Sequence, residues 1–146
     1  MTCLHLPPVP ASVRVARHWA APLLPADVRD PVVLVISELV TNAVAVDTAA
    51  GTGNDIEVEL VVDPAGRHVT LTVTDASDRP LPDAPVTVPA DKDGGRGLLL
   101  VHALADDHGW IPRPRGGKRV WALFRSLAAP PRRGAPCPER LERADA

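Results

Sequence analysis

The feature that most constrains the fold is an apolar run from Pro31 to Val46 that is interrupted by Glu38 and Asn42. If the run is helical, these two polar residues, four positions apart, lie one above the other on one face. A carboxylate and an amide on the inner side of an apolar helix cost free energy unless they have polar partners. A metal ion with phosphates and an ordered water would supply such partners, whereas a polar seam facing solvent would need none. The run alone leaves both interpretations open.

The composition indicates one globular domain with an aliphatic core. The chain has 146 residues, of which 45% are hydrophobic and only 3% aromatic. A formal net charge of −2 gives no electrostatic reason to expect binding to nucleic acid or to an anionic membrane surface. The N-terminus lacks the regions of a signal peptide, and the longest apolar run is too short and too polar to span a bilayer. Together with two distant cysteines, Cys3 and Cys137, this favours a cytoplasmic location.

Hydrophobic periodicity predicts two helices in the first third of the chain. Apolar residues at helical spacing indicate a helix over 13–24, with Ser12 as its N-cap and Pro22 at the point where it ends or kinks. A second helix holds the apolar run. We expect it to carry Pro31 in its first turn and to continue to about Asp47.

Alternation of β-branched and polar residues predicts strands later in the chain. Period-two patterns indicate strands over 56–62 and 69–75, joined by a hairpin turn at 63–66. Two closing strands are predicted over 110–113 and 119–125. The strands therefore pair largely as antiparallel neighbours.

A proline-rich segment, 78–93, separates the two pairs of strands and is expected to be an irregular loop. It leads into a glycine-rich loop, 94–97, and then into a third helix over 98–105 that Gly109 ends. The order of elements predicts an α+β fold, a two-layer α/β sandwich with helices on one face of a mixed, mainly antiparallel sheet. We expect residues 1–10 to be an extended leader, 11–127 the domain, and 128–146 a disordered tail.

Three polar elements of this fold carry the chemistry of a candidate site. Glu38 and Asn42 lie on the second helix, Asp75 ends a strand, and the 94–97 loop enters the third helix. A glycine loop at a helix N-terminus offers free N–H groups and a positive dipole end, which bind phosphate. Taken singly, Asp75 is also explained as a turn residue and the glycine loop as a flexible connector. The loop is neither a Walker A motif nor a dinucleotide fingerprint.

The ordered combination resembles the GHKL ATP-binding family, which includes histidine kinases, gyrase B and MutL. More narrowly it is similar to the anti-sigma-factor serine/threonine kinases typified by RsbW and SpoIIAB, in their stand-alone actinobacterial form. The motifs that carry the resemblance are Glu38-x-x-x-Asn42, Asp75-x-Ser77, Gly95-Arg96-Gly97-Leu98 and Gly117-Lys118-x-Val120-Trp121. The resemblance implies a Bergerat-type ATP-binding fold.

The resemblance also implies roles for individual residues, with ATP and Mg²⁺ as cofactors. Glu38 would be the catalytic base or would orient a water, Asn42 would hold Mg²⁺, and Asp75 would bind the adenine amine. The predicted nucleotide-binding residues are Asn42, Asp75, Ser77, Gly95, Arg96, Gly97 and Leu98. The proline-rich segment would be the lid over the nucleotide.

The function implied is that of an ATP-dependent kinase that phosphorylates a serine of a small antagonist protein and controls a sigma factor. The antagonist and the sigma factor would be its partners, and a homodimer is expected by resemblance. A detached ATPase half of a two-component system is a further interpretation. It would need a separate partner that carries the phosphoacceptor histidine.

Departures from the family's pattern support an alternative function. Ser77 and Arg79 stand where the family has glycines after the aspartate, and Ala45, Val46 and Asp47 follow Asn42 in place of a basic residue and a histidine. The alternative is a non-catalytic or nucleotide-independent module that acts by protein contact as an anti-sigma factor or adaptor.

Two residues of the last motif have competing interpretations. Lys118 in the closing turn would either reach phosphate or be a solvated turn lysine. Trp121 alternates with apolar neighbours, which favours packing on the sheet over a platform for stacking a base.

Overall fold

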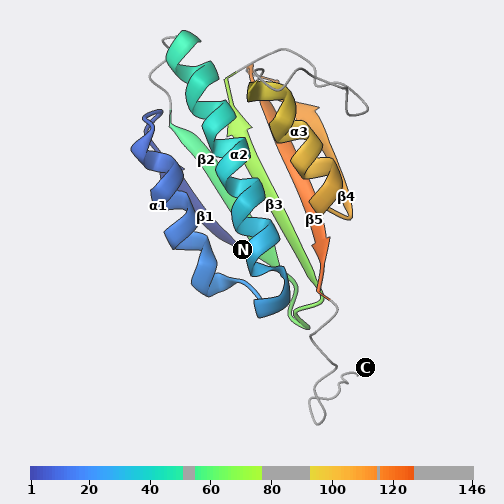
Figure 1. Cartoon of the computed structure of the whole chain (residues 1–146). Helices are drawn as coiled ribbons and strands as arrows, with labels where there is room; N and C mark the ends of the chain where they lie inside the picture. The colour runs from blue at the N-terminus through green and yellow to red at the C-terminus, as the bar shows by residue number, and fades with distance from the viewer. Residues whose placement is uncertain (51–54, 77–92, 115, 127–146) are drawn as a thin grey trace.

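The computed structural model describes residues 1–50, 55–76, 93–114 and 116–126, and for 48–50 and 93–98 the backbone only. Five strands form one sheet in the order β1-β2-β3-β5-β4, and each described strand pair is antiparallel. The helices lie in a single layer on one face of this sheet (Figure 1). The predicted α+β sandwich is therefore confirmed, with an antiparallel sheet. The elements are β1 (Thr2–Leu6), α1 (Ala11–Ala20), the 3₁₀ turn η1 (Ala21–Leu23), α2 (Ala26–Ala50), β2 (Ile56–Val62), β3 (His68–Asp75), α3 (Asp93–Leu104), β4 (Asp107–Pro112) and β5 (Lys118–Arg125).

The hairpin of β2 and β3 forms as the alternation predicts. Apolar side chains of both strands point to the helices, and Val58 pairs with Val73 and Leu60 with Leu71 in register. The connecting turn is fixed by Asp63, whose carboxylate accepts a 2.6 Å hydrogen bond from the N–H of residue 67. The predicted strands over 56–62 and 69–75 and the turn between them are confirmed, with β3 beginning one residue earlier.

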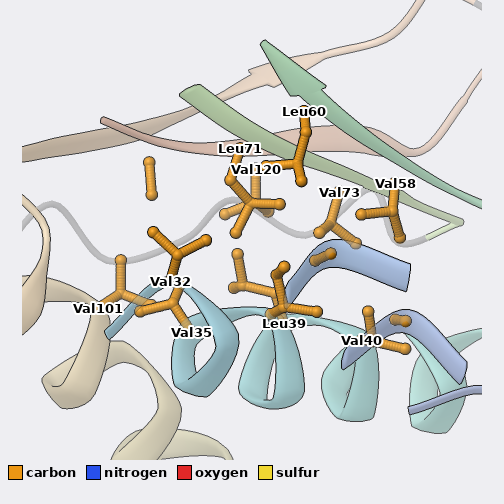
Figure 2. Packing of buried hydrophobic residues seen from close by; sticks show 14 of the residues in the cluster. Val32, Val35, Leu39, Val40, Val58, Leu60, Leu71, Val73, Val101 and Val120 are labelled. Carbon is orange, nitrogen blue, oxygen red and sulfur yellow. The ribbon is translucent and has the colours of Figure 1, made fainter. Parts of the chain in front are cut away.

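The core lies between the sheet and α2, the central helix of the layer. Figure 2 shows valine and leucine side chains of α2 packed against those of β2, β3 and β5. Aliphatic residues supply this core, and Phe124 is its one buried aromatic among the described residues. Fully buried core residues include Val32, Val35, Ile36, Val40, Ile56, Val58, Val69 and Leu71.

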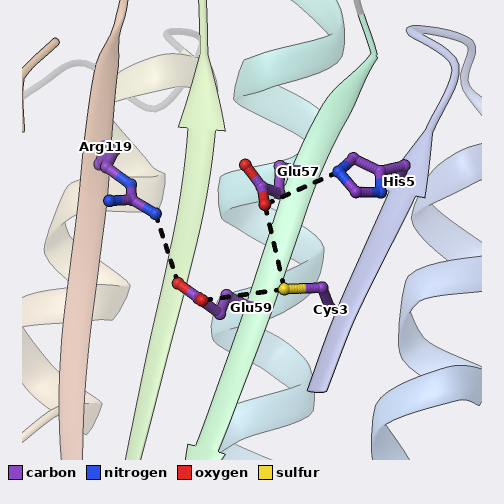
Figure 3. Close-up of polar contacts among 5 residues, drawn as sticks. All are labelled: Cys3, His5, Glu57, Glu59 and Arg119. Atoms are coloured by element: carbon purple, nitrogen blue, oxygen red, sulfur yellow. Dashed lines mark hydrogen bonds and ion pairs between the residues drawn. The ribbon is translucent and has the colours of Figure 1, made fainter. Parts of the chain in front are cut away.

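The face of the sheet away from the helices carries polar side chains instead (Figure 3). Glu59 lies between Cys3 and Arg119, with Sγ to Oε2 at 3.7 Å and a guanidinium nitrogen to Oε1 at 3.4 Å. His5 lies 3.6 Å from a carboxylate oxygen of Glu57. Strand alternation therefore separates an aliphatic face under the helices from a charged face that no described helix covers.

The first strand corrects the prediction of an extended leader outside the sheet. Thr2–Leu6 is β1, an edge strand paired with β2. Leu6 is buried in the core while Leu4 packs against it, so this short segment has one apolar face. An alternation of only two apolar residues was too short to identify a strand from the sequence. The predicted loop at 78–92 and the tail at 128–146 lie outside the described residues.

The ends of the first two helices also differ from the predictions. α1 begins with Pro10 at its N-cap rather than Ser12, whose hydroxyl donates a 2.6 Å hydrogen bond to the Pro7 carbonyl. α1 ends before Pro22, as predicted, and continues as a 3₁₀ turn. α2 begins at Ala26, so Pro31 lies inside the helix rather than in its first turn. As the sixth residue of α2, Pro31 has no N–H for the i to i−4 bond of an interior residue, so one helical hydrogen bond is missing there.

The guanidinium of Arg29 helps to stabilise this early start of α2. It donates hydrogen bonds of 2.9 and 3.0 Å to the carbonyl oxygens of Ala21 and Leu24. These carbonyls belong to the 3₁₀ turn and its C-cap residue, and that of Ala21 also accepts the Leu24 N–H at 3.3 Å. The first turn of α2 is thereby held against the end of the preceding turn.

α3 begins earlier and ends earlier than predicted. It runs from Asp93 to Leu104, so Gly94–Gly97 form its first turn instead of a loop before it. Gly109 does not end the helix but lies in β4, where a Cβ would come within 2.8 Å of the Trp121 ring. The helix ends because Asp106 joins the sheet, with its N–H donating to the Leu123 carbonyl at 2.8 Å. Trp121 packs on the sheet, as predicted.

Candidate functional site

The ends of two helices and two strands meet at one end of the sandwich. α2 and β3 finish there, and α3 and β5 begin there (Figure 1). Because β3 and β5 are antiparallel neighbours in the sheet, the last residue of β3 lies opposite the first of β5, and the register pairs Asp75 with Lys118. Asp75 and Lys118, distant in sequence, are thus brought together at this end of the fold.

Asp75 and Lys118 form a buried ion pair in this region. The Lys118 ammonium lies 3.2 Å from Oδ1 of Asp75, and the two side chains are 5% and 8% exposed. Both residues alternate in phase with Val73 and Val120, so they point to the helix-covered face. The prediction of a solvated turn lysine is therefore wrong. The period-two pattern of β5 extends to Lys118, and this signal could have placed it on the buried face.

Asp47 is a third charged residue here, and the sequence did not single it out as part of the site. Asp47 is 2% exposed, and its carboxylate accepts a 2.8 Å hydrogen bond from the Ala76 N–H. Burial raises the pKa of Asp47, and the charge of Asp75 adds to this, against the opposing effects of the Ala76 hydrogen bond and of Lys118. Two carboxylates and one ammonium therefore share the end of β3.

Gly117 allows the two strands to approach at this point. Its φ is +81°, and a Cβ on it would lie 2.3 Å from the Asp75 carbonyl oxygen. A side chain would therefore both strain the backbone and collide with β3. The glycine before Lys118 is needed to hold Lys118 opposite Asp75.

Glu38 and Asn42 are half-buried on α2. Asn42 lies seven residues, or nearly two turns, beyond Val35, so both are on the same side of the helix. Figure 2 shows Val101 of α3 beside Val35, which identifies this side as the one facing α3. The polar pair therefore borders the space between α2 and α3 rather than forming a seam on fully exposed surface.

The glycine-rich segment lies at the N-terminus of α3, at the same end of the molecule (Figure 1). The backbone of Gly95, Arg96, Gly97 and Leu98 is helical, and this end of a helix carries a partial positive charge. For these four residues the structure describes the backbone only, and Ser77 lies outside the described residues. Of the predicted site residues, the structure thus places Asp75 and the start of α3 at one end of the sandwich, and it places Asn42 and Glu38 on α2, eight and twelve residues before the end of that helix.

A sequence profile decides the family. The profile of the histidine kinase-like ATPase domain matches residues 6–124. The chain belongs to the histidine kinase-like ATPase domain family. The match runs from the last residue of β1 to the penultimate residue of β5, so it covers the three helices, the strands from β2 onward and the end of the sheet that carries Asp75 and Lys118.

Membership in the histidine kinase-like ATPase family indicates ATP binding and confirms the broad resemblance. A comparison with curated proteins found no match. Within the described residues, no helix has the length and apolar character needed to cross a membrane.

Proposed function

We propose that this protein is an ATP-binding regulator of the anti-sigma-factor serine/threonine kinase type. The observation that carries the proposal is the position of Glu38 and Asn42, half-buried one turn apart on α2, where the helical repeat puts Asn42 on the same side as Val35. Asp75, at the end of β3, and the N-terminus of α3 lie at one end of the sandwich (Figure 1). An acid, an amide and a helix N-terminus are the groups that a Mg²⁺-bound triphosphate needs.

The donor set fits Mg²⁺ held jointly by protein and nucleotide. The described residues contain no group of three or more histidine, cysteine or acidic side chains that could bind a metal. Mg²⁺ is commonly held by one or two protein oxygens and by substrate phosphates, so the amide oxygen of Asn42 is a suitable ligand. The ion, when bound, would neutralise charge on the phosphates.

The remaining residues would position the reactants. Glu38, one turn from Asn42, would accept the proton of the attacking hydroxyl or orient it. The amide groups of Gly95 to Gly97 at the start of α3 would bind phosphate oxygens. Asp75 would accept a hydrogen bond from the base.

We further propose that the phosphate acceptor is a serine of a small antagonist protein and that the kinase binds a sigma factor. A homodimer belongs to the same proposal. These partners rest on the resemblance of the motifs at Glu38–Asn42 and Gly95–Leu98 to those of the anti-sigma-factor kinases. The histidine kinase-like ATPase family is compatible with this subfamily.

The ion pair favours a second candidate, a module that acts by protein contact without nucleotide. Lys118 already neutralises the carboxylate that would bind the base, at 3.2 Å. In that case the protein would act through surfaces that bind a partner protein, and substitutions of Glu38 and Asn42 would leave partner binding unchanged.

Calorimetric titration of Mg·ATP into wild type, Asn42→Ala and Thr41→Ala tests the proposal. Thr41 is the exposed neighbour of Asn42, with its hydroxyl bonded to the Ser37 carbonyl at 2.6 Å, so it controls for the change to alanine. We expect binding by wild type and Thr41→Ala and a loss for Asn42→Ala. Wild type that does not bind Mg·ATP would contradict the proposal and favour the nucleotide-independent module.

A further inference from the structure

Lys118 is a buried ammonium whose position the fold alone does not explain. The residue is 4% exposed and opens β5, where an apolar or hydroxyl side chain would satisfy the strand equally well. A lysine is almost never buried unless it is paired. Its pairing with Asp75 removes the cost of an isolated charge, but buried ion pairs are often no more stabilising than apolar residues of similar volume.

The ammonium also has unused donors within the described part of the chain. A lysine carries three N–H donors. Among the described residues, Oδ1 of Asp75 is the acceptor within hydrogen-bonding distance of Nζ, at 3.2 Å. A buried donor with remaining capacity, next to a residue that would bind the base, is suited to contact a ligand.

The pair presents a donor and an acceptor side by side. A carboxylate alone accepts from the amine of a 6-aminopurine and repels the carbonyl of a 6-oxopurine. With Lys118 beside it, an aminopurine can place its amine against Asp75 and its ring N1 against Lys118. A 6-oxopurine can place O6 against Lys118 and its N1–H against Asp75. Asp75 and Lys118 can therefore satisfy the hydrogen-bonding groups at positions 1 and 6 of either purine.

We propose that Lys118 is a specificity-determining residue that lets the base site accept 6-oxopurine as well as 6-aminopurine nucleoside triphosphates. The inference rests on the proposed nucleotide binding and names its substrate class more broadly than ATP. Gly117 contributes by holding Lys118 opposite Asp75, since a side chain there would collide with the end of β3.

The test compares ATP with inosine triphosphate, which differs from ATP only at positions 6 and 1 of the purine. Dissociation constants of both, with Mg²⁺, are measured for wild type, Lys118→Met and Arg119→Met. Arg119 is the matched control, because it is the next residue of β5 and pairs with Glu59 on the opposite face at 3.4 Å. Hydrogen bonds to charged groups change affinity by roughly tenfold to hundredfold.

We expect wild type and Arg119→Met to bind inosine triphosphate within about tenfold of ATP, because each edge makes two hydrogen bonds. Lys118→Met should weaken inosine triphosphate by at least about tenfold more than ATP. ATP then loses only the contact to ring N1, whereas O6 of inosine triphosphate loses its donor and is also left beside the negative carboxylate of Asp75. Thermal unfolding of each variant reports whether the fold is retained.

Two results would overturn the inference while leaving ATP binding intact. One is a wild type that binds ATP but binds inosine triphosphate more than about a hundredfold more weakly, a ratio that needs no variant. The other is a folded Lys118→Met with an unchanged ratio. Failure of wild type to bind either nucleotide would instead contradict the proposed function itself, so the two failures are distinguishable.

Discussion

The carboxylate of Asp47 accepts a 2.8 Å hydrogen bond from the backbone N–H of Ala76, which joins α2 to the residue after β3. This contact holds the helix that carries Glu38 and Asn42 against the strand that carries Asp75. Glu38 and Asn42 come from α2, and Asp75 comes from β3. Among the described side chains, that of Asp47 makes the hydrogen bond between these two elements at this end. Its loss should therefore affect stability and the site together.

Substitutions of Asp47 should separate the hydrogen bond from the charge. Asp47→Ala leaves the Ala76 N–H without its acceptor, which should lower the free energy of unfolding by about 1 to 3 kcal/mol. Asp47→Asn keeps a carbonyl oxygen for this bond and removes a buried charge, so its stability near pH 7 should equal or exceed that of wild type. Urea denaturation of both variants measures the difference, and an Asp47→Asn variant as unstable as Asp47→Ala would contradict this account.

The same residue should make stability depend on pH. Because the folded protein raises the pKa of Asp47 above its ordinary value of 3.8, the folded state holds the proton more tightly than the unfolded state. The contribution of Asp47 to the free energy of unfolding is therefore highest at low pH, and it falls as the pH rises from 3.8 through the raised pKa. Urea denaturation across this window should show that decline in wild type and a smaller one in Asp47→Asn. Equal slopes would contradict the prediction.

Gly117→Ala should be much more damaging than Gly116→Ala. Both glycines have positive φ, 81° and 99°, so both variants carry the cost of a left-handed backbone, about 1 to 2 kcal/mol. Among the described residues, it is Gly117 whose Cβ would lie 2.3 Å from a backbone oxygen of β3. We expect Gly117→Ala to lose roughly 2 to 5 kcal/mol in thermal or urea unfolding. Similar losses for both variants would mean that β5 can move away from Asp75.

The hairpin and the helical layer were predictable because long segments repeat one period. Seven residues of β2 alternate from Ile56 to Val62, and the apolar run of α2 spans several turns. β1 offered too few residues for a period, and Gly109 has a packing reason that local sequence does not show. The order of the motifs along the chain was visible in the sequence, whereas their positions in space depend on the fold.

The contacts among the charged residues at the end of β3 could not be predicted, because each contact joins distant elements. Asp47 follows the apolar run and was a departure from the family's pattern, yet its partner is 29 residues away. Lys118 lies beside two glycines, as a solvated turn lysine would, and its counterion is 43 residues away. Sequence periodicity places such residues on a face, whereas only the pairing of strands and helices places them together.

Phe124 should be the most sensitive residue of β5. It is 2% exposed, and a phenylalanine cut to alanine in a packed core costs about 3 to 5 kcal/mol. A domain of this size has a total stability of about 5 to 15 kcal/mol, so Phe124→Ala should unfold at far lower urea concentration. The neighbouring Leu123→Ala, on the half-buried opposite face, should cost about 1 kcal/mol and serves as the control. Equal costs would contradict the two-faced character of β5.

Glu38→Gln should separate phosphoryl transfer from nucleotide binding. The glutamine keeps the shape of a half-buried side chain on α2 but cannot accept a proton, and loss of a general base lowers a rate by about 10² to 10⁴. Binding of Mg·ATP, which depends on Asn42, should change little. Glu57→Gln, on the charged face of the sheet, is the control and should leave the rate unchanged.

The rate is measured as transfer of labelled phosphate from ATP to a candidate antagonist, and binding is measured by calorimetry. If Glu38→Gln transferred phosphate as fast as wild type, Glu38 would have no part in catalysis. If it lost ATP binding instead, its role would lie in holding the nucleotide.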